Sequence, residues 1–188
     1  MSQTPRERLL ETATSLLYRD GIQAVGINRI VAEAEVALMT LYRQFGDKDT
    51  LVAAALENWS DHWLHSLRDH IDRSGDDPKA RFDGLWDALE EWYTSDGFHG
   101  SFIASATTEL RGEPEHPAHR VIAGHRAAMR HLLEDLAKAN GAHDPDELAT
   151  HLQVIIDGAT SLAVADRTFG STRNARALAG AALAAGAA

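Results

Sequence analysis

Ten histidines are the first residues of this sequence to consider for metal or acid–base chemistry. His62 and His65 are three residues apart, as are His116 and His119, and this spacing can bring two imidazoles to one helix face for a metal ion. However, the sequence contains no HExxH motif and no cysteine to complete such a site. We therefore interpret these histidines as surface residues and expect neither a metal nor another cofactor.

Motifs for enzyme catalysis are also missing. The sequence contains no glycine-rich phosphate-binding loop, no GxSxG motif and no cysteine nucleophile. Glu90 and Glu91 form a pair of acids, but adjacent residues point to different sides of a helix and do not face one site. The sequence therefore predicts a protein that is not an enzyme.

The net charge of −10 is carried by the C-terminal part of the chain. Residues 1–48 contain six basic and six acidic residues, whereas residues 49–188 contain 12 basic and 22 acidic residues. Because the negative C-terminal part repels phosphate, we expect any contact with DNA to come from the first 48 residues.

Other features of the composition point to the cytoplasm. The chain has no cysteine, which excludes disulfides and is typical of a reducing compartment. The N-terminal residues lack the apolar stretch of a signal peptide. No apolar run approaches the roughly 20 residues that cross a bilayer, so we expect no membrane partner.

Helical periodicity dominates the sequence, with apolar residues three and four positions apart and no strand-like alternation. These patterns, with stops at Gly21 and Gly141 and starts at Asp47 and Pro145, predict an all-α fold of about nine helices. The predicted helices span about residues 6–19, 27–34, 38–44, 48–73, 78–93, 98–110, 115–139, 145–169 and 173–186.

The segment from Gly21 to Leu51 is the most informative part of the chain. It contains two short amphipathic helices joined by a tight turn at Glu35–Ala37. This arrangement is typical of a helix-turn-helix, in which the second short helix enters the major groove of DNA. The recognition helix is then expected at residues 38–44.

At these positions the sequence resembles the TetR (tetracycline-repressor-like) family. The residues that carry the resemblance are Gly21, Gly26, Ile30-Val31, Glu35-Val36, Leu41-Tyr42, Phe45, Lys48 and Leu51. The resemblance implies a three-helix DNA-binding domain at residues 1–48. It also implies a helical bundle at residues 49–188 that binds a small-molecule effector and forms a homodimer.

The spacing within the motif assigns different roles to its residues. Leu41 and Phe45, four residues apart, are predicted to pack into the small core, which leaves Tyr42 outside to reach a phosphate. Lys48 is expected to contact a second phosphate. The resemblance adds candidates for contact with DNA, of which Asn28 and Thr40 can pair with bases. These further candidates are Asn28, Ala37, Met39, Thr40 and Gln44.

Two residues depart from the family pattern in the turn and at the start of the recognition helix. Glu35 occupies a position that is usually glycine, and if its φ is positive it costs roughly 1 kcal/mol. Ala37 replaces the usual Ser or Thr cap, which costs about 1 kcal/mol more. These changes leave open a second function, a DNA-independent helical sensor or protein-interaction module with a degenerate helix-turn-helix.

The C-terminal part offers candidates for the effector site and the dimer interface. Helical bundles can hold ligands between helices, and the aromatic interior suggests a largely apolar effector. The predicted pocket residues are Trp63, Trp86, Phe98, Phe102 and Met129. Small and branched residues of the helix at about 145–169 permit close approach of a second copy, and the predicted interface residues are Ile155, Ala159, Leu162 and Ala163. We therefore expect a one-component regulator, most often a repressor in this family, that binds palindromic operator DNA as a homodimer.

Overall fold

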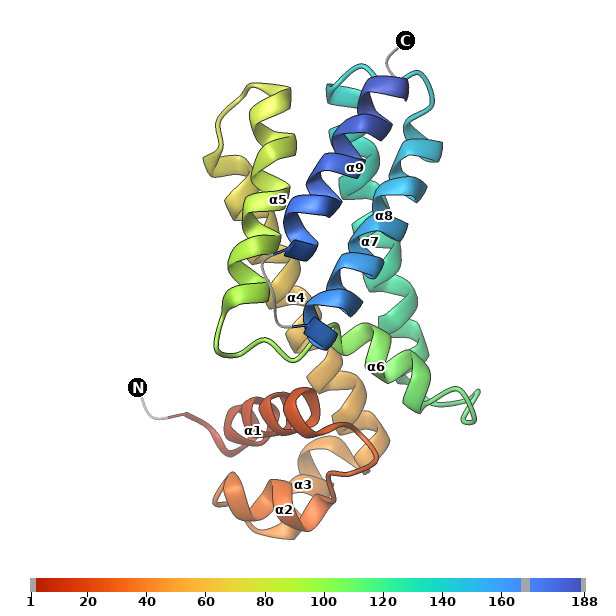
Figure 1. Cartoon of the computed structure of the whole chain (residues 1–188). Coiled ribbons are helices and arrows are strands. Elements are labelled where there is room, and N and C mark those ends of the chain that lie inside the picture. The colour runs from red at the N-terminus through yellow and green to blue at the C-terminus, as the bar shows by residue number, and fades with distance from the viewer. Residues whose placement is uncertain (1–2, 167–169, 187–188) are drawn as a thin grey trace. The chain divides into compact units, whose positions relative to one another are not determined.

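The computed structural model describes residues 3–166 and 170–186, and every regular element within them is a helix (Figure 1). The described helices are α1 (Pro5–Asp20), α2 (Ile27–Glu33), α3 (Leu38–Phe45), α4 (Lys48–Arg73), α5 (Pro78–Thr94), α6 (Phe102–Glu109), α7 (Ala118–Ala139), α8 (Pro145–Asp166) and α9 (Gly170–Gly186). The prediction of an all-α fold is confirmed.

Side-chain caps explain why several helices begin where they do. Thr4 and Glu7 form a reciprocal capping box at the start of α1. Asp47 accepts a hydrogen bond from the backbone N–H of Thr50 at 2.7 Å at the start of α4. Asp77 and Asp144 accept equivalent bonds at the starts of α5 and α8. These local signals are readable in the sequence because each cap lies within three residues of its partner.

The α5–α6 connection differs from its prediction. A helix was expected over 98–110, but α6 begins at Phe102. Gly100 has a φ of 91°, which interrupts a right-handed helix, and the Ser101 side chain caps the new helix by accepting from the N–H of Ala104 at 3.2 Å. The predicted end of α8 at residue 169 lies outside the described residues.

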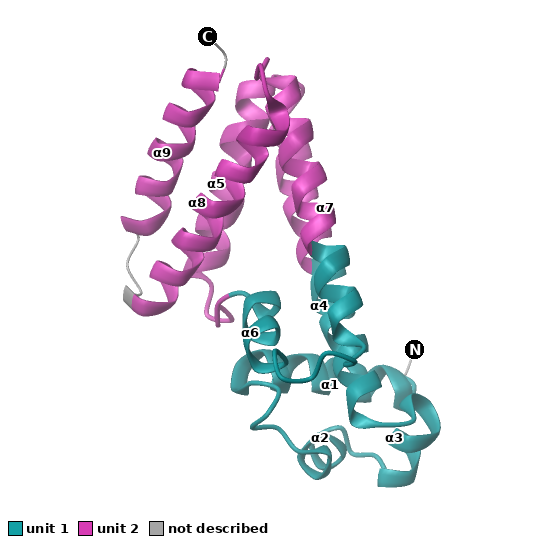
Figure 2. Cartoon of the chain, turned by 90° about the vertical axis from the view of Figure 1, so that its right-hand side faces the viewer, with its two compact units in different colours: residues 1–62, 101–125 teal, residues 63–100, 126–188 magenta. Residues whose placement is uncertain are grey.

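The chain divides into two compact units (Figure 2). Unit 1 comprises residues 1–62 and 101–125, and unit 2 comprises residues 63–100 and 126–188. Helices α4 and α7 each contribute residues to both units. The domain boundary expected after residue 48 coincides with the start of α4, whereas the compact units divide the chain within that helix.

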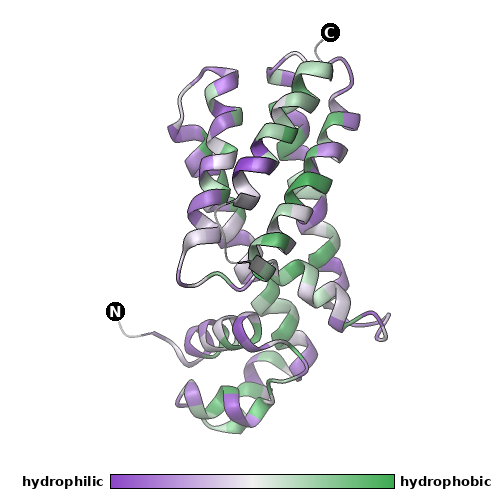
Figure 3. Ribbon diagram, viewed as in Figure 1, coloured by the Kyte–Doolittle hydropathy of each residue, from purple (hydrophilic) through white to green (hydrophobic). Residues whose placement is uncertain are grey.

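Unit 2 contains α8 and α9, which pack along each other. Figure 3 shows long apolar stretches in both helices. Within the described residues, one segment, Pro145–Ala165 of α8, has the length and composition of a membrane-crossing helix, although core helices of soluble proteins meet the same criterion. The segment contains the charged residues Asp146, Glu147 and Asp157, so its apolar residues do not form one unbroken run.

Candidate nucleic-acid interface

Helices α2 and α3 are held together by a small apolar core in unit 1. Leu41 and Phe45 lie on the inner face of α3, where they are buried with Ile30 of α2 and Leu9 of α1. Because this inner face is fully occupied, the orientation of α3 is set by packing. The predicted burial of Leu41 and Phe45 is confirmed.

The opposite face of α3 is open to solvent. Met39 is 74% exposed and Tyr42 is 42% exposed. Arg43 and Gln44 are also exposed, and Thr40 is half-buried. A recognition helix needs exposed side chains that reach base edges and phosphates. The exposed face of α3 therefore has the side chains of a DNA-reading surface.

Asn28 and Lys48 lie near α3 in the chain but have different surroundings. Asn28 is exposed on α2. Lys48 is half-buried, and its Nζ donates a hydrogen bond to the backbone oxygen of Ile22 at 2.9 Å. An ammonium group has three donors, so this bond fixes Lys48 against the α1–α2 connection and leaves donors for a phosphate. Its contact with DNA remains a prediction.

The turn between α2 and α3 has a strained backbone. Among the residues that the structure describes, Glu35 is the one non-glycine residue with positive φ, at 52°. The N–H of the next residue, Val36, donates to the backbone oxygen of Val31 at 3.1 Å and closes the turn. The turn therefore requires the left-handed conformation, which costs a side-chain-bearing residue roughly 1 kcal/mol.

Ala37 occupies the N-cap of α3, with extended backbone angles of φ −71° and ψ 145°. Its methyl group cannot accept a hydrogen bond, whereas a Ser or Thr side chain in this position can accept one from the first turn. Ala37 is exposed beside Leu38 and Met39. The recognition helix is thus held by its packed inner face and not by a side-chain cap.

Several cations of unit 1 are occupied by carboxylates. Arg19 and Arg29 both contact Asp20, at 2.9 and 2.7 Å, and Arg29 also contacts Glu33 at 3.0 Å. The hydrogen bond from Arg19 is the main reason that the pKa of Asp20 is lowered to about 2. These arginines are therefore already neutralised before DNA arrives.

Arg43 is a candidate that the sequence reasoning missed. It is exposed on α3 directly after Tyr42, and it has no ion-pair partner among the described residues. Its signal in the sequence was its basic side chain on the outer face of the recognition helix. An unpaired guanidinium in this position is available to a phosphate oxygen.

We expect Arg43→Gln to weaken DNA binding to a similar degree for all sequences. One phosphate contact per protomer is lost, so the slope of log affinity against log salt should become shallower by about 2 for a dimer. Fluorescence anisotropy at several salt concentrations measures this slope. Arg19→Gln is the matched control, since Arg19 is paired with Asp20. An unchanged slope for Arg43→Gln would exclude the contact.

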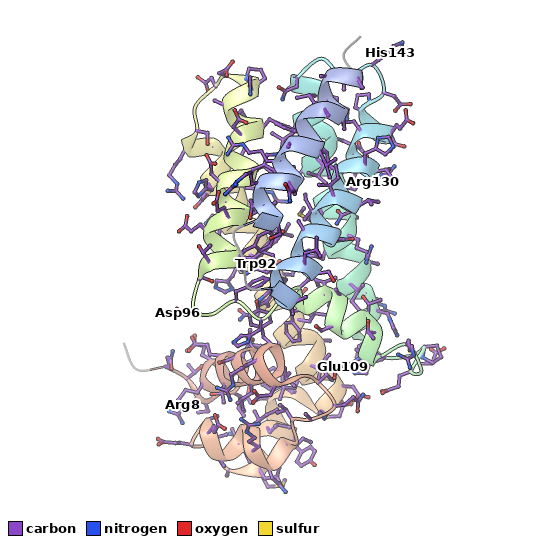
Figure 4. All side chains as sticks on the ribbon, in the orientation of Figure 1. Arg8, Trp92, Asp96, Glu109, Arg130 and His143 are labelled. Carbon is purple, nitrogen blue, oxygen red and sulfur yellow. The ribbon has the colours of Figure 1, made fainter. Side chains whose placement is uncertain are left out.

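The α6–α7 segment also belongs to unit 1 and contacts the helix-turn-helix. The carboxylate of Glu109, at the end of α6 (Figure 4), accepts a hydrogen bond from the backbone N–H of Gln23 at 2.8 Å. His116 is buried and its Nε2 lies 3.6 Å from the carboxylate of Asp49 on α4. These contacts join residues more than 60 positions apart, so no local sequence pattern could predict them.

The histidine pairs do not assemble into a metal site in the described part of the chain. His62 contacts the backbone oxygen of Asn58, and His119 contacts that of Glu113, at 2.6 and 2.9 Å. Within the described residues no group of three His, Cys, Asp or Glu side chains could hold a metal ion.

The predicted pocket residues fall into separate clusters. Phe102 packs in unit 1, with ring centroids 5.8 Å from Tyr18 and 6.0 Å from Trp59. The remaining four, Trp63, Trp86, Phe98 and Met129, belong to unit 2. Trp86 and Met129 are buried in its core, whereas Trp63 lines a groove of about 190 Å³ between α4 and α5.

The predicted dimer residues also differ in exposure. Leu162 of α8 is 54% exposed, and Ile155 is half-buried. Ala159 and Ala163 are buried within the subunit, so their small side chains serve packing inside one chain. Sequence reasoning missed Val154, which is 67% exposed on α8. It also missed Leu178, which is exposed on α9.

Comparisons with known proteins agree with this architecture. A family model described as "Bacterial regulatory proteins, tetR family" matches residues 9–55, which contain α2 and α3. The HTH-type transcriptional regulator YjdC of Escherichia coli (strain K12) is 24% identical over 178 residues, covering 93% of this chain and 91% of the relative. The crystal structure of a TetR-family transcriptional regulator from Streptomyces coelicolor superposes with a TM-score of 0.87 at 28% identity, covering 98% and 96% of the two chains. The helix-turn-helix segment of this chain thus matches the TetR family, and the whole chain has the fold of TetR-family regulators.

These matches confirm the resemblance to the TetR family that was inferred from the helix-turn-helix motif. TetR-family regulators are transcription factors and not enzymes, so the absence of a catalytic motif agrees with the family. The crystal structure of reduced NemR from Escherichia coli has the same fold, with a TM-score of 0.81 at 19% identity over 92% and 94% of the two chains. By its likeness to TetR-family transcriptional regulators, the chain is expected to bind DNA through α3.

Proposed function

We propose that this TetR-family chain is a repressor that binds a palindromic operator as a homodimer and is released by a small-molecule effector. The observation that carries this proposal is the exposed face of α3, where Met39 and Tyr42 stand opposite the buried Leu41 and Phe45. Residues 1–48 supply this surface, and the acidic remainder supplies the effector and dimer functions. We place the protein in the cytoplasm, where operator DNA and metabolites are both available.

Dimer formation is supported by the outer faces of α8 and α9. On α8, Val154, Gly158, Ser161, Leu162 and Ala165 recur at helical spacing, and all are exposed in the single chain. On α9, Leu178 lies on a similar exposed stripe with small neighbours. Large apolar residues flanked by small ones permit close helix packing between two copies. A two-fold dimer then presents two α3 helices to successive major-groove segments, about 34–36 Å apart.

Effector release requires a route from unit 2 to the DNA-binding helices. Helix α4 supplies this route. Its first residue, Lys48, donates a hydrogen bond to the α1–α2 connection, and its residues from Trp63 onward belong to unit 2. A ligand that shifts α4 changes the spacing of the two α3 helices and weakens DNA binding. The coupling is reciprocal, so operator DNA should weaken effector binding by the same factor.

A selection of random DNA duplexes tests the proposal. We expect a palindrome with half-sites one helical turn apart, and Tyr42→Ala should reduce affinity for it by roughly tenfold through loss of the phosphate contact. Tyr42→Phe keeps the ring and removes the hydroxyl, so it should lose most of the same affinity. Selection of no sequence at low or physiological salt would favour the DNA-independent sensor or interaction module instead.

A further inference from the structure

The groove between α4 and α5 is lined by residues that recur on one face of each helix. From α4 it receives Trp63, Ser66 and His70, at spacings of three and four residues. From α5 and the residue after it come Glu91, Trp92 and Ser95. Its volume of about 190 Å³ is below the roughly 300–1,000 Å³ of pockets for drug-sized ligands. The groove can therefore accept only a small molecule or one small part of a larger one.

Aromatic rings form the walls of this groove. Trp63 and Trp92 meet edge to face, with centroids 5.2 Å apart and planes at 64°. Trp92, labelled in Figure 4, also contacts Tyr93 and Phe98, at 5.4 and 5.0 Å. Contacts on several sides fix the orientation of the Trp92 ring, so the wall is preformed. Ring faces carry partial negative charge and attract cations.

The charged lining of the groove is acidic. The Glu91 carboxylate is 77% exposed and lies 3.5 Å from Nδ1 of His70. None of the described lining residues is Lys or Arg. Nearby arginines are held by other carboxylates, Arg81 by Asp72 at 2.7 Å and Arg176 by Asp87 at 2.6 Å. The groove therefore offers one carboxylate beside two indole rings, and its described lining contains no Lys or Arg to compete for that carboxylate.

These features favour one of the three ligand charge classes. An anion meets Glu91 and the acidic surface of unit 2, in which residues 63–100 and 126–188 hold 16 acidic and 10 basic residues. A neutral apolar ligand contacts the rings but gains no attraction from the Glu91 carboxylate. A cation with methyl groups satisfies the rings and the carboxylate together.

We propose that this groove binds a small organic cation of the quaternary ammonium class, with its methyl groups against Trp63 and Trp92 and its charge near Glu91. The sequence predicted a largely apolar effector, and an alkylated ammonium ion is a more specific form of that prediction. The further statement that this ligand is the effector rests on the proposed function.

Choline and its neutral isostere 3,3-dimethylbutan-1-ol test the binding site, because they differ in charge and hardly in shape. Isothermal titration calorimetry of the full-length protein should give choline an affinity about tenfold higher than the alcohol. Glu91→Gln and Trp92→Leu should each remove most of this preference, while His70→Gln should strengthen choline binding by freeing the carboxylate. Glu90→Gln is the matched control, since Glu90 is exposed and does not line the groove.

Equal affinities for the two probes, no detectable binding of choline, or an unchanged preference in Glu91→Gln would overturn the site. A second measurement separates this result from the proposed function, namely operator affinity with and without saturating choline. Choline that binds with the expected preference supports the site whether or not operator affinity changes. Loss of operator binding altogether would contradict the proposed function and leave the calorimetric result for the groove intact.

Discussion

Leu162→Arg is expected to convert the dimer into a monomer and to abolish tight binding to the palindromic operator. Leu162 is 54% exposed in the single chain, so an arginine there is accommodated without disturbing the fold. In the proposed dimer the same position is buried against the partner. Two unpaired guanidinium groups would then be desolvated, which costs about 3 kcal/mol or more and weakens association by roughly a hundredfold.

Analytical ultracentrifugation and operator titration should report the two losses together. Gln153→Arg is the matched control, because it adds the same charge to α8 away from the Leu162 face, next to Asp157. Thermal unfolding of the isolated variant checks that the subunit still folds. A Leu162→Arg protein that stays dimeric, or a monomer that binds the palindrome as tightly as the parent chain, would contradict the proposed interface.

The dimer surface illustrates where sequence reasoning reaches its limit. Helix α8 is apolar around most of its circumference, so its composition does not say which face is turned inward. Small side chains pointed to Ala159 and Ala163, yet the structure buries both inside the subunit. Only packing against the neighbouring helices decides which face of α8 points into the subunit. Leu162 and Val154 are left on the outside as a consequence.

Local signals were far more predictive. The recognition helix was expected at 38–44 and spans Leu38–Phe45, since the Leu41–Phe45 spacing defines its inner face. The cap at Asp47 was also predicted and is present. The helix expected over 98–110 was too long because the backbone angle of Gly100 is not encoded by periodicity.

Contacts between distant residues were beyond reach of the sequence. The hydrogen bond from Gln23 to Glu109 joins residues 86 positions apart, and nothing in either local pattern marks it. For the same reason, the aromatic composition could suggest a pocket but could not show that Phe102 and Trp63 belong to different clusters. Those two side chains lie in different compact units. The groove was visible only once α4 and α5 were placed side by side.

Glu35→Gly is expected to stabilise the protein and to strengthen DNA binding at once. Glu35 has a φ of 52° within the helix-turn-helix, and glycine adopts this conformation without a Cβ clash. Relief of the clash should add about 1 kcal/mol of stability, or a rise in Tm of roughly 2–4 °C. Removing one negative charge per protomer near the DNA phosphates should raise operator affinity roughly fivefold at low salt.

Glu35→Ala separates the two causes, because alanine removes the charge and keeps the Cβ atom. It should match Glu35→Gly in operator affinity and match the parent chain in Tm. Differential scanning calorimetry and anisotropy titrations at two salt concentrations give both quantities. Equal Tm values for the Gly and Ala variants would mean that the turn stores no backbone strain at this residue. A gain in affinity that persists at high salt would mean that the charge is not its source, since screening weakens such repulsion. The turn would then act on DNA binding through the position of α3, which the strained residue helps to set.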